Sequence, residues 1–334
     1  MRVITCASYY GTGSSAVTDL FSEFDCVCSL GDYEYRFLQD PNGIADLEYN
    51  LVENNHRHNS SDAIKRYCKY LKQAKKMGYG GYDIFGNSLE EETKKYINSI
   101  VDLKVHTWWN KDRLDRGQLF CFIDRIYSYG KRLFSGDLKS EKRYSLLTKL
   151  EYGYYTSVTE DKFLKETKRY VDSLLMSVNK ENKKYVMVDQ MVPPSNVNRY
   201  IRYFNDVKVI VVDRDPRDIY LLEKVFWQWG VIPVSNVKDF VEWFKITRIT
   251  SYSPNENSSC VCRIRFEDLV YKYEETKQKL FEFVGVDESE HVEKLKKFNP
   301  EKSKENTNLK GRVKGFEKDI KYIEDNLKEY LYNF

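Results

Sequence analysis

The chain has 334 residues, and its 54 Lys and Arg against 51 Asp and Glu leave a formal net charge of only +3. Charge so nearly balanced excludes a polybasic nucleic-acid coat and an acidic tail, but it leaves room for a local cationic site. With 16 Gly and 7 Pro, the chain also falls outside the disordered and collagen-like classes.

In chain order, buried strands and amphipathic helices alternate at both ends of the sequence. We predict a strand at Val3–Ala7, a helix at Ser14–Phe24, a strand at Cys26–Leu30, helices at Ser61–Lys76, Ser88–Leu103 and Asp161–Val178, a strand at Tyr185–Val188, a short helix at Asn196–Phe204, a strand at Val207–Asp213, a helix at Pro216–Trp227, a strand at Cys260–Phe266, and helices at Tyr273–Val284 and Ile320–Leu331. This alternation predicts an α/β fold of three layers, with a mainly parallel sheet flanked by helices.

The middle of the sequence breaks this rhythm between about residues 102 and 159, where Trp, Tyr, Arg and Lys are frequent. We expect a single domain over residues 1–334, in which residues 51–184 form an approximate, mostly helical insertion or acceptor-binding cap.

The compartment is indicated by the cysteines and the apolar runs. No run reaches the roughly 18 apolar residues of a membrane span, and the polar residues from Ser8 onward make Met1–Val17 unlike a signal peptide. Seven Cys, an odd number, fit free thiols in a reducing cytosol, so we expect a cytoplasmic protein. The pairs Cys26/Cys28 and Cys260/Cys262 predict packed thiols on one strand face rather than a zinc site, and we expect no metal.

The segment Ser8–Ser15, with the sequence SYYGTGSS, lies between a predicted strand and a predicted helix. Gly11 and Gly13 let the backbone approach an anion, and the helix N-terminus offers free N–H groups. This is the chemistry of a phosphate cradle, although it lacks the Lys of a Walker A loop. A loose dinucleotide fingerprint, completed by Ala16 and Asp32, and a plain glycine turn are the alternatives.

A second segment, Val207–Asp218, ends a buried strand with Arg214 and places Arg217 in the first turn of a helix. Arginine suits a terminal phosphate because its planar fork binds two oxygens at once. Three Asp residues in the same segment could instead neutralise both cations. Two further segments, Arg263–Leu269 and Phe298–Arg312, taken alone predict an ordinary core strand with its helix and a solvated polar loop.

The order of these four segments resembles the PAPS-dependent sulfotransferase family, which has a P-loop-NTPase-like fold. The resemblance implies sulfonate transfer from PAPS to a hydroxyl acceptor, either a glycan or a small lipid-like alcohol, without a metal or nucleic-acid partner. It implies nucleotide binding by Tyr10, Gly11, Thr12, Gly13, Ser14, Ser15, Arg214, Arg217, Lys310, Gly311 and Arg312.

The sequence departs from this family at two places. Gly11 stands where the family loop carries a cation, and Leu222 stands where it often carries a Ser. One phosphate contact and one sulfonate-side cation must therefore come from elsewhere, with Lys310 and Arg312 as candidates, or the site is degenerate and binds PAP without catalysis. The other alternative is a kinase or NTPase of related topology. The missing P-loop Lys and the lack of an acidic metal-binding strand argue against it.

Sulfonyl transfer also needs a base for the acceptor proton. Glu34, just past the second predicted strand, is the first candidate, with Asp32 behind it, and an ion pair between Glu34 and Arg36 is the alternative. His106 is the main rival, together with His56 and His58.

The acceptor has its own candidates. Asp189 and Gln190, at a predicted strand end, are placed to orient it, unless they only terminate the strand. Trp108 in the insertion offers an aromatic face for a sugar ring, sterol or lipid tail, with an ordinary packed helical cap as the alternative.

Overall fold

The computed structural model describes residues 1–136, 143–249 and 255–334. It divides into two compact units, the first formed by residues 1–40, 73–89 and 167–334 and the second by residues 41–72 and 90–166. The second unit lies largely within the expected insertion at 51–184, although residues 73–89 and 167–184 belong to the first unit. Its assignment as the acceptor-binding cap stays a prediction.

The first unit is built on a five-stranded parallel sheet with the order β2-β5-β1-β6-β7. Its strands are β1 (Arg2–Ser8), β2 (Val27–Glu34), β5 (Tyr185–Asp189), β6 (Val207–Asp213) and β7 (Val261–Arg265). The predicted α/β class with its mainly parallel sheet is confirmed. Because all five strands run the same way, their carboxyl ends meet at one edge of the sheet.

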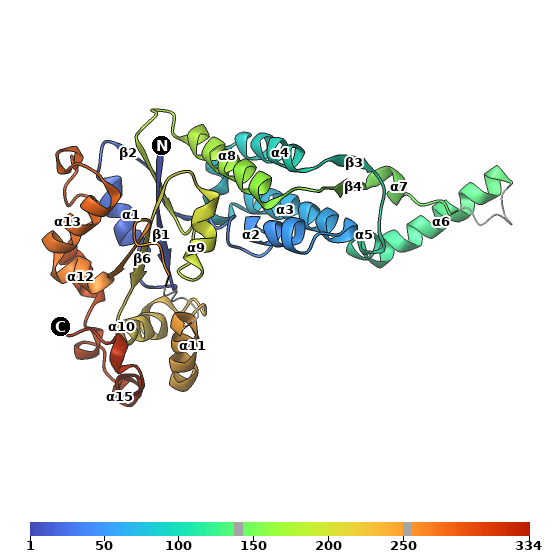
Figure 1. The fold of residues 1–334 in the computed structure, drawn as a ribbon. Coiled ribbons are helices and arrows are strands. Elements are labelled where there is room, and N and C mark those ends of the chain that lie inside the picture. Colours follow the sequence, from blue (N-terminus) through green and yellow to red (C-terminus); the bar gives the residue numbers. More distant parts are fainter. Residues whose placement is uncertain (137–142, 250–254) are drawn as a thin grey trace. The chain divides into compact units, whose positions relative to one another are not determined.

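Helices cover both faces of this sheet, as Figure 1 shows for α1, α12 and α13 on one side and α9 on the other. The helices of this unit, with those it shares with the second unit, are α1 (Ser14–Ser22), α3 (Arg57–Met77), α4 (Ser88–Ile100), α8 (Glu160–Val178), α9 (Val197–Tyr200), α10 (Pro216–Leu221), α11 (Val237–Ile249), α12 (Phe266–Tyr271), α13 (Tyr273–Val284), α14 (Pro300–Ser303) and α15 (Glu317–Asn326). One core layer forms where Val17 and Phe21 of α1 pack with Met187, Ile210 and Leu280. The central strands are near-continuous buried runs, because helices cover both faces of the sheet.

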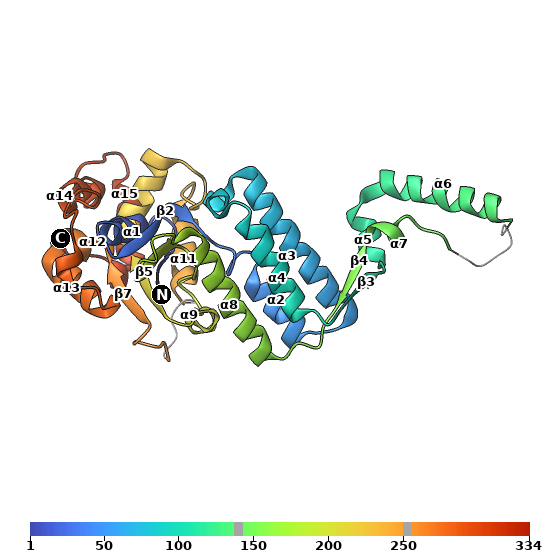
Figure 2. The ribbon, with the colours of Figure 1, turned by 90° about the horizontal axis from the view of Figure 1, so that it is seen from above.

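The second unit contains a feature that the sequence did not predict, an antiparallel strand pair formed by β3 and β4. The elements of the second unit, apart from those it shares with the first, are α2 (Ile44–Glu48), β3 (Leu103–His106), α5 (Asn110–Asp115), α6 (Gly117–Ser135), α7 (Leu147–Leu150) and β4 (Tyr152–Tyr155). Figure 2 shows α6 after α5 in this unit. No helix in the described ranges is both long and apolar enough to cross a membrane.

Several predicted bounds need correction. The predicted helix Pro216–Trp227 is α10 followed by a π-helical turn at Leu222–Trp227, and the predicted helix Asn196–Phe204 is α9 followed by a 3-10 turn. The second strand runs on to Glu34 instead of ending at Leu30, because a register irregularity between Ser29 and Glu34 lets it resume pairing with β5. All seven cysteines are free, and Cys28 and Cys262 lie in strands, whereas Cys26 and Cys260 precede them.

Candidate functional site

A pocket of about 540 Å³ lies at the carboxyl edge of the parallel sheet. Each of the five strands delivers one lining residue at or just after its end, namely Ser8, Glu34, Asp189, Arg214 and Phe266. Open α/β sheets bind ligands at this edge, so the position agrees with the expectation from sequence.

The loop between β1 and α1 is shaped by close contacts of two glycines with aromatic rings. Gly11 has φ +67°, and a Cβ atom there would lie 2.7 Å from Cζ3 of Trp227. Gly13 has φ +96°, and its Cβ would lie 2.5 Å from Cδ2 of Phe266. Side chains are therefore excluded at both positions by space and by backbone conformation. A basic residue at position 11, which the resemblance leads one to expect, would meet the Trp227 indole.

Four other residues of this loop have different surroundings. Tyr10 and Ser15 are exposed and line the pocket. Thr12 is fully buried, where its hydroxyl donates to Val212 O at 2.7 Å and accepts from Tyr9 N at 3.3 Å. Its hydroxyl fixes the loop to β6 rather than facing the pocket. Ser14 lines the pocket and donates through Oγ to Asp189 Oδ2 at 3.0 Å.

The first turn of α1 offers backbone donors to this pocket. Gly13 is its N-cap residue, and no side chain caps the helix there. The N–H groups at the start of a helix have no partner within the helix, and they carry the positive end of its dipole. An anion bound against Gly13–Ser15 would complete these hydrogen bonds.

Arg214 is the strongest sign of an anion site. Its side chain is 3% exposed, it lies over the Phe266 ring at 4.4 Å, and it donates to the carbonyls of Gly11 and Asn306. No carboxylate pairs with it in the described part of the chain, and its Nε has no hydrogen-bond partner. Burial lowers the pKa of its guanidinium, which nearby Asp218 and Glu267 only partly offset. A buried unpaired cation costs free energy that an anionic ligand would recover.

Glu267 accepts a backbone hydrogen bond next to Arg214, and its titration makes the stability of the folded chain depend on pH. Burial raises its pKa from 4.5 to about 7, while it accepts a hydrogen bond from Asp215 N at 2.7 Å. The folded state thus holds this proton to higher pH than the unfolded chain. The stability it contributes is complete below about pH 4.5 and is lost as pH rises towards about 7.

We therefore predict that Glu267→Gln is more stable than the wild type at about pH 8, by up to about 3 kcal/mol, and similar to it near pH 4. Urea unfolding at both pH values measures this. The matched control is Glu282→Gln, at an exposed carboxyl of α13, which should follow the wild type. Equal pH slopes for Glu267→Gln and the wild type would contradict the assignment.

The other predicted phosphate contacts lie outside the pocket lining. Arg217 is buried and forms ion pairs with Asp215 at 2.7 Å and Glu324 at 2.9 Å. Lys310 pairs with the same Glu324 at 2.8 Å, whereas Arg312 donates to the carbonyls of residues 304 and 307. Gly311 ends a 3-10 turn beside them. Neutralisation by acids, the alternative considered for the second segment, therefore holds for Arg217, and a nucleotide role for these four residues stays a prediction.

Glu34 is the last residue of β2 and not, as expected, part of a following loop. Its carboxylate lies 3.5 Å from Arg36, which also binds Asp40 at 2.8 Å and covers the Tyr10 ring. It lines the pocket and is paired in register with Asp189. The predicted ion pair with Arg36 is present, and a role of Glu34 as the base stays a prediction. The Asp32 side chain is outside those that the structure describes.

Asp189 and Gln190 form a polar cluster with the loop. Gln190 has φ 58°, donates through Nε2 to Ser8 Oγ and lies 3.4 Å from Ser14 Oγ. Its Oε1 is buried without a partner. Asp189 ends β5 and accepts a hydrogen bond from the Ser14 hydroxyl at the start of α1.

The candidates in the second unit have other neighbours. His106 is exposed at the end of β3, with its ring 4.0 Å from that of Tyr152. Trp108 is half-buried between β3 and α5, and His58 stacks on Trp109 at 3.6 Å. All residues that line the sheet-edge pocket belong to the first unit, whereas these candidates belong to the second unit.

Several residues that line the pocket were not among the predicted site residues, and aromatic and charged side chains are among them. Trp227 and Trp229 stack face to face at 5.1 Å, and Glu223 is buried beside them with its Oε2 unpartnered. Lys297 and Lys302 line another part of the wall, and within the described ranges no carboxylate pairs with either ammonium group. The only signal in the sequence was the Trp-x-Trp spacing and the cations around Phe298.

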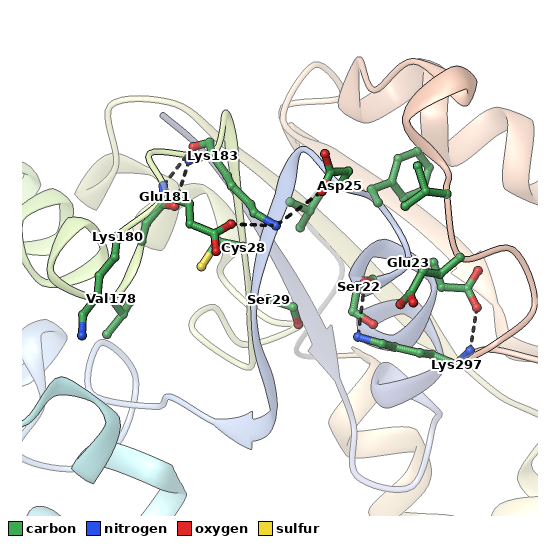
Figure 3. Close-up of a pocket in the computed structure, with 15 residues that line it drawn as sticks. Ser22, Glu23, Asp25, Cys28, Ser29, Val178, Lys180, Glu181, Lys183 and Lys297 are labelled. Atoms are coloured by element: carbon green, nitrogen blue, oxygen red, sulfur yellow. Dashed lines mark hydrogen bonds and ion pairs between the residues drawn. The ribbon is translucent and has the colours of Figure 1, made fainter.

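A second cavity of about 510 Å³ lies beside the end of α1 and explains how Lys297 is held (Figure 3). Glu23, fully buried, accepts from Lys297 N at 2.8 Å, and Lys297 Nζ donates to Ser22 O at 3.3 Å. Lys183 in the same wall pairs with Glu181 at 3.3 Å. Because these polar groups already have partners, the cavity indicates no ligand. The two contacts of Lys297 hold the segment that continues from it into the lining of the first pocket.

No family model and no curated protein matches this chain. The similar solved structures include the sulfotransferase domain of the Synechococcus PCC 7002 olefin synthase, at TM-score 0.41 and 10% identity, which covers 100% of this chain and 95% of that one. The sulfotransferase domain from the curacin biosynthetic pathway has the same TM-score and identity, with 99% and 98% covered. Retinol dehydratase in complex with androsterone and PAP has TM-score 0.31 and 15% identity, with 100% and 83% covered. At these values the likeness decides nothing about the activity of this chain.

Proposed function

We propose that this chain is a sulfotransferase that moves a sulfonate group from PAPS to a hydroxyl acceptor in the cytosol. The observation that carries the proposal is Arg214, a buried guanidinium without a carboxylate partner among the described residues, in one pocket with the uncapped start of α1 and Glu34. The residues fit the donor nucleotide, because both of its anionic ends require cations or N–H groups. PAPS supplies the sulfonate and leaves as PAP.

Each part of the pocket then has one task. The N–H groups of Gly13–Ser15 hold the 5′-phosphosulfate, and Arg214 holds the 3′-phosphate. Lys297 and Lys302 supply the positive charge that Gly11 cannot. As the acceptor oxygen bonds to sulfur and the bond between sulfur and the bridging oxygen breaks, Glu34 takes the acceptor proton.

The activity is tested with purified full-length protein, radiolabelled PAPS and a panel of sugars, sterols and simple alcohols. Label transfer that requires Glu34 supports the proposal. PAP binding without transfer to any acceptor would favour a non-catalytic PAP-binding protein. Absence of PAP binding would overturn the proposal.

A second candidate, metal-dependent phosphoryl transfer, is favoured by one contact. The Ser14 hydroxyl of the loop donates to the strand-end carboxylate of Asp189, and a carboxylate and a hydroxyl are the groups that hold Mg²⁺ near phosphates in P-loop enzymes. Magnesium-dependent ATP turnover that is lost in Asp189→Asn, together with no response to PAP, would establish this function instead.

For the acceptor we propose contact with Trp229, which is 70% exposed and lines the pocket. Its face suits the C–H side of a sugar ring, and the unpartnered Oε2 of Glu223 would accept a ring hydroxyl. Trp229→Ala should raise the KM for the acceptor about tenfold and leave PAP affinity within about twofold. Phe226→Ala, at an exposed aromatic of the same turn outside the pocket lining, is the control and should change neither. Weaker PAP binding by Trp229→Ala would instead assign the indole pair to the adenine.

A further inference from the structure

Helix α6 of the second unit exposes an apolar face. Seven apolar or aromatic side chains are between 46% and 96% exposed, namely Leu119, Phe122, Ile123, Ile126, Tyr129, Leu133 and Phe134. Their spacing of three and four residues places them on one side of the helix. A patch of this size on one helix marks an interaction surface rather than scattered exposure.

The opposite side of α6 is the one that packs within the unit. Asp124 is 4% exposed and accepts hydrogen bonds from Ser145 Oγ at 2.9 Å and Leu146 N at 2.7 Å. A helix of a globular unit normally buries its apolar stripe and exposes its charges. In α6 the carboxylate is inside and the apolar stripe is outside.

Charge decides what this face contacts. Asp124 is the one acid in α6, whose cations are Arg125, Lys131 and Arg132. Arg125 and Lys131 are exposed, and no carboxylate in the described ranges pairs with either. A second copy of α6 would present only further cations at its surface, so pairing between copies would gain no opposite charge. Anionic lipid headgroups match both the apolar face and its cationic border.

We propose that α6 binds membrane surfaces that contain anionic lipids. Its apolar face would enter the boundary between headgroups and acyl chains, while Arg125 and Lys131 stay at headgroup level. The aromatic residues Phe122, Tyr129 and Phe134 suit this interface. The inference does not depend on the reaction proposed above.

The test is flotation of the full chain with phosphatidylcholine vesicles, with and without phosphatidylglycerol, at low and high salt. We expect binding only with phosphatidylglycerol and weaker binding at high salt. Ile126→Asp should reduce vesicle binding at least about tenfold. Arg125→Glu combined with Lys131→Glu should reduce it at least about fivefold and remove its salt dependence.

Met77→Asp is the matched control, because it places the same charge on an isolated residue of α3 that is 81% exposed, and it should bind vesicles as the wild type does. Circular dichroism melting establishes that each variant is folded. Wild-type protein that does not float with anionic vesicles, or Ile126→Asp that floats normally, would overturn the proposal. The proposal would also be overturned if the protein did not bind vesicles but formed a concentration-dependent dimer that Ile126→Asp abolished.

Discussion

Arg214→Ala should lower the affinity for PAP by roughly a hundredfold and abolish the preference for PAP over AMP. The reason is that AMP lacks only the 3′-phosphate, the group that we assign to this buried guanidinium. Isothermal titration with both nucleotides, on the wild type and the variant, separates the loss of this contact from a general loss of binding.

Arg2→Ala is the matched control. Arg2 begins β1 at the opposite end of the sheet and pairs with Asp206 at 2.9 Å, so its loss should leave the preference for PAP intact. A variant at position 214 that still prefers PAP would refute the assignment. Loss of the preference in Arg312→Ala would instead support the closing-loop contact that the sequence resemblance implies.

Glu34→Gln should reduce sulfonate transfer by about a hundred- to ten-thousandfold and leave PAP affinity unchanged, because the amide keeps the shape of the side chain but cannot take a proton. Single-turnover measurement with PAPS and a saturating acceptor reports this step without product release.

The comparison variants for this step are Glu329→Gln, at an exposed carboxyl near the end of the chain, and His106→Asn. Glu329→Gln should transfer sulfonate at the wild-type rate. Should His106→Asn lose transfer while Glu34→Gln keeps it, the base would be the imidazole and not the carboxylate.

The central strands of the sheet were predictable because they are short runs of buried, mostly apolar residues. The predicted Val207–Asp213 agrees with β6, and Val3–Ala7 differs from β1 by one residue at each end. The β3–β4 pair escaped prediction because each strand has only four residues, of which all but Gly153 are exposed or half-buried. The π-helical turn after α10 also escaped, since its sequence keeps a helical pattern throughout.

The site was predictable only where one short segment carries the chemistry. Arg214 stands at the end of a buried strand, so its place followed from local sequence. Lys297 and Lys302 come more than 80 residues after Arg214 in the sequence. Lys297 is held at the pocket by the hydrogen bond from its backbone N to Glu23, which is 274 positions away. Contacts over such separations depend on tertiary packing, which a local pattern does not encode.

The pairing of β1 also constrains how the chain is made. Arg2–Ser8 is synthesised well before both of its partners, β5 and β6, which lie past the midpoint of the sequence. At roughly 5–20 residues per second, this apolar strand waits on the order of ten to forty seconds before its neighbours exist. During that interval its unpaired edge is open to other nascent chains, so the yield of folded protein should depend on chaperones and should fall as synthesis slows.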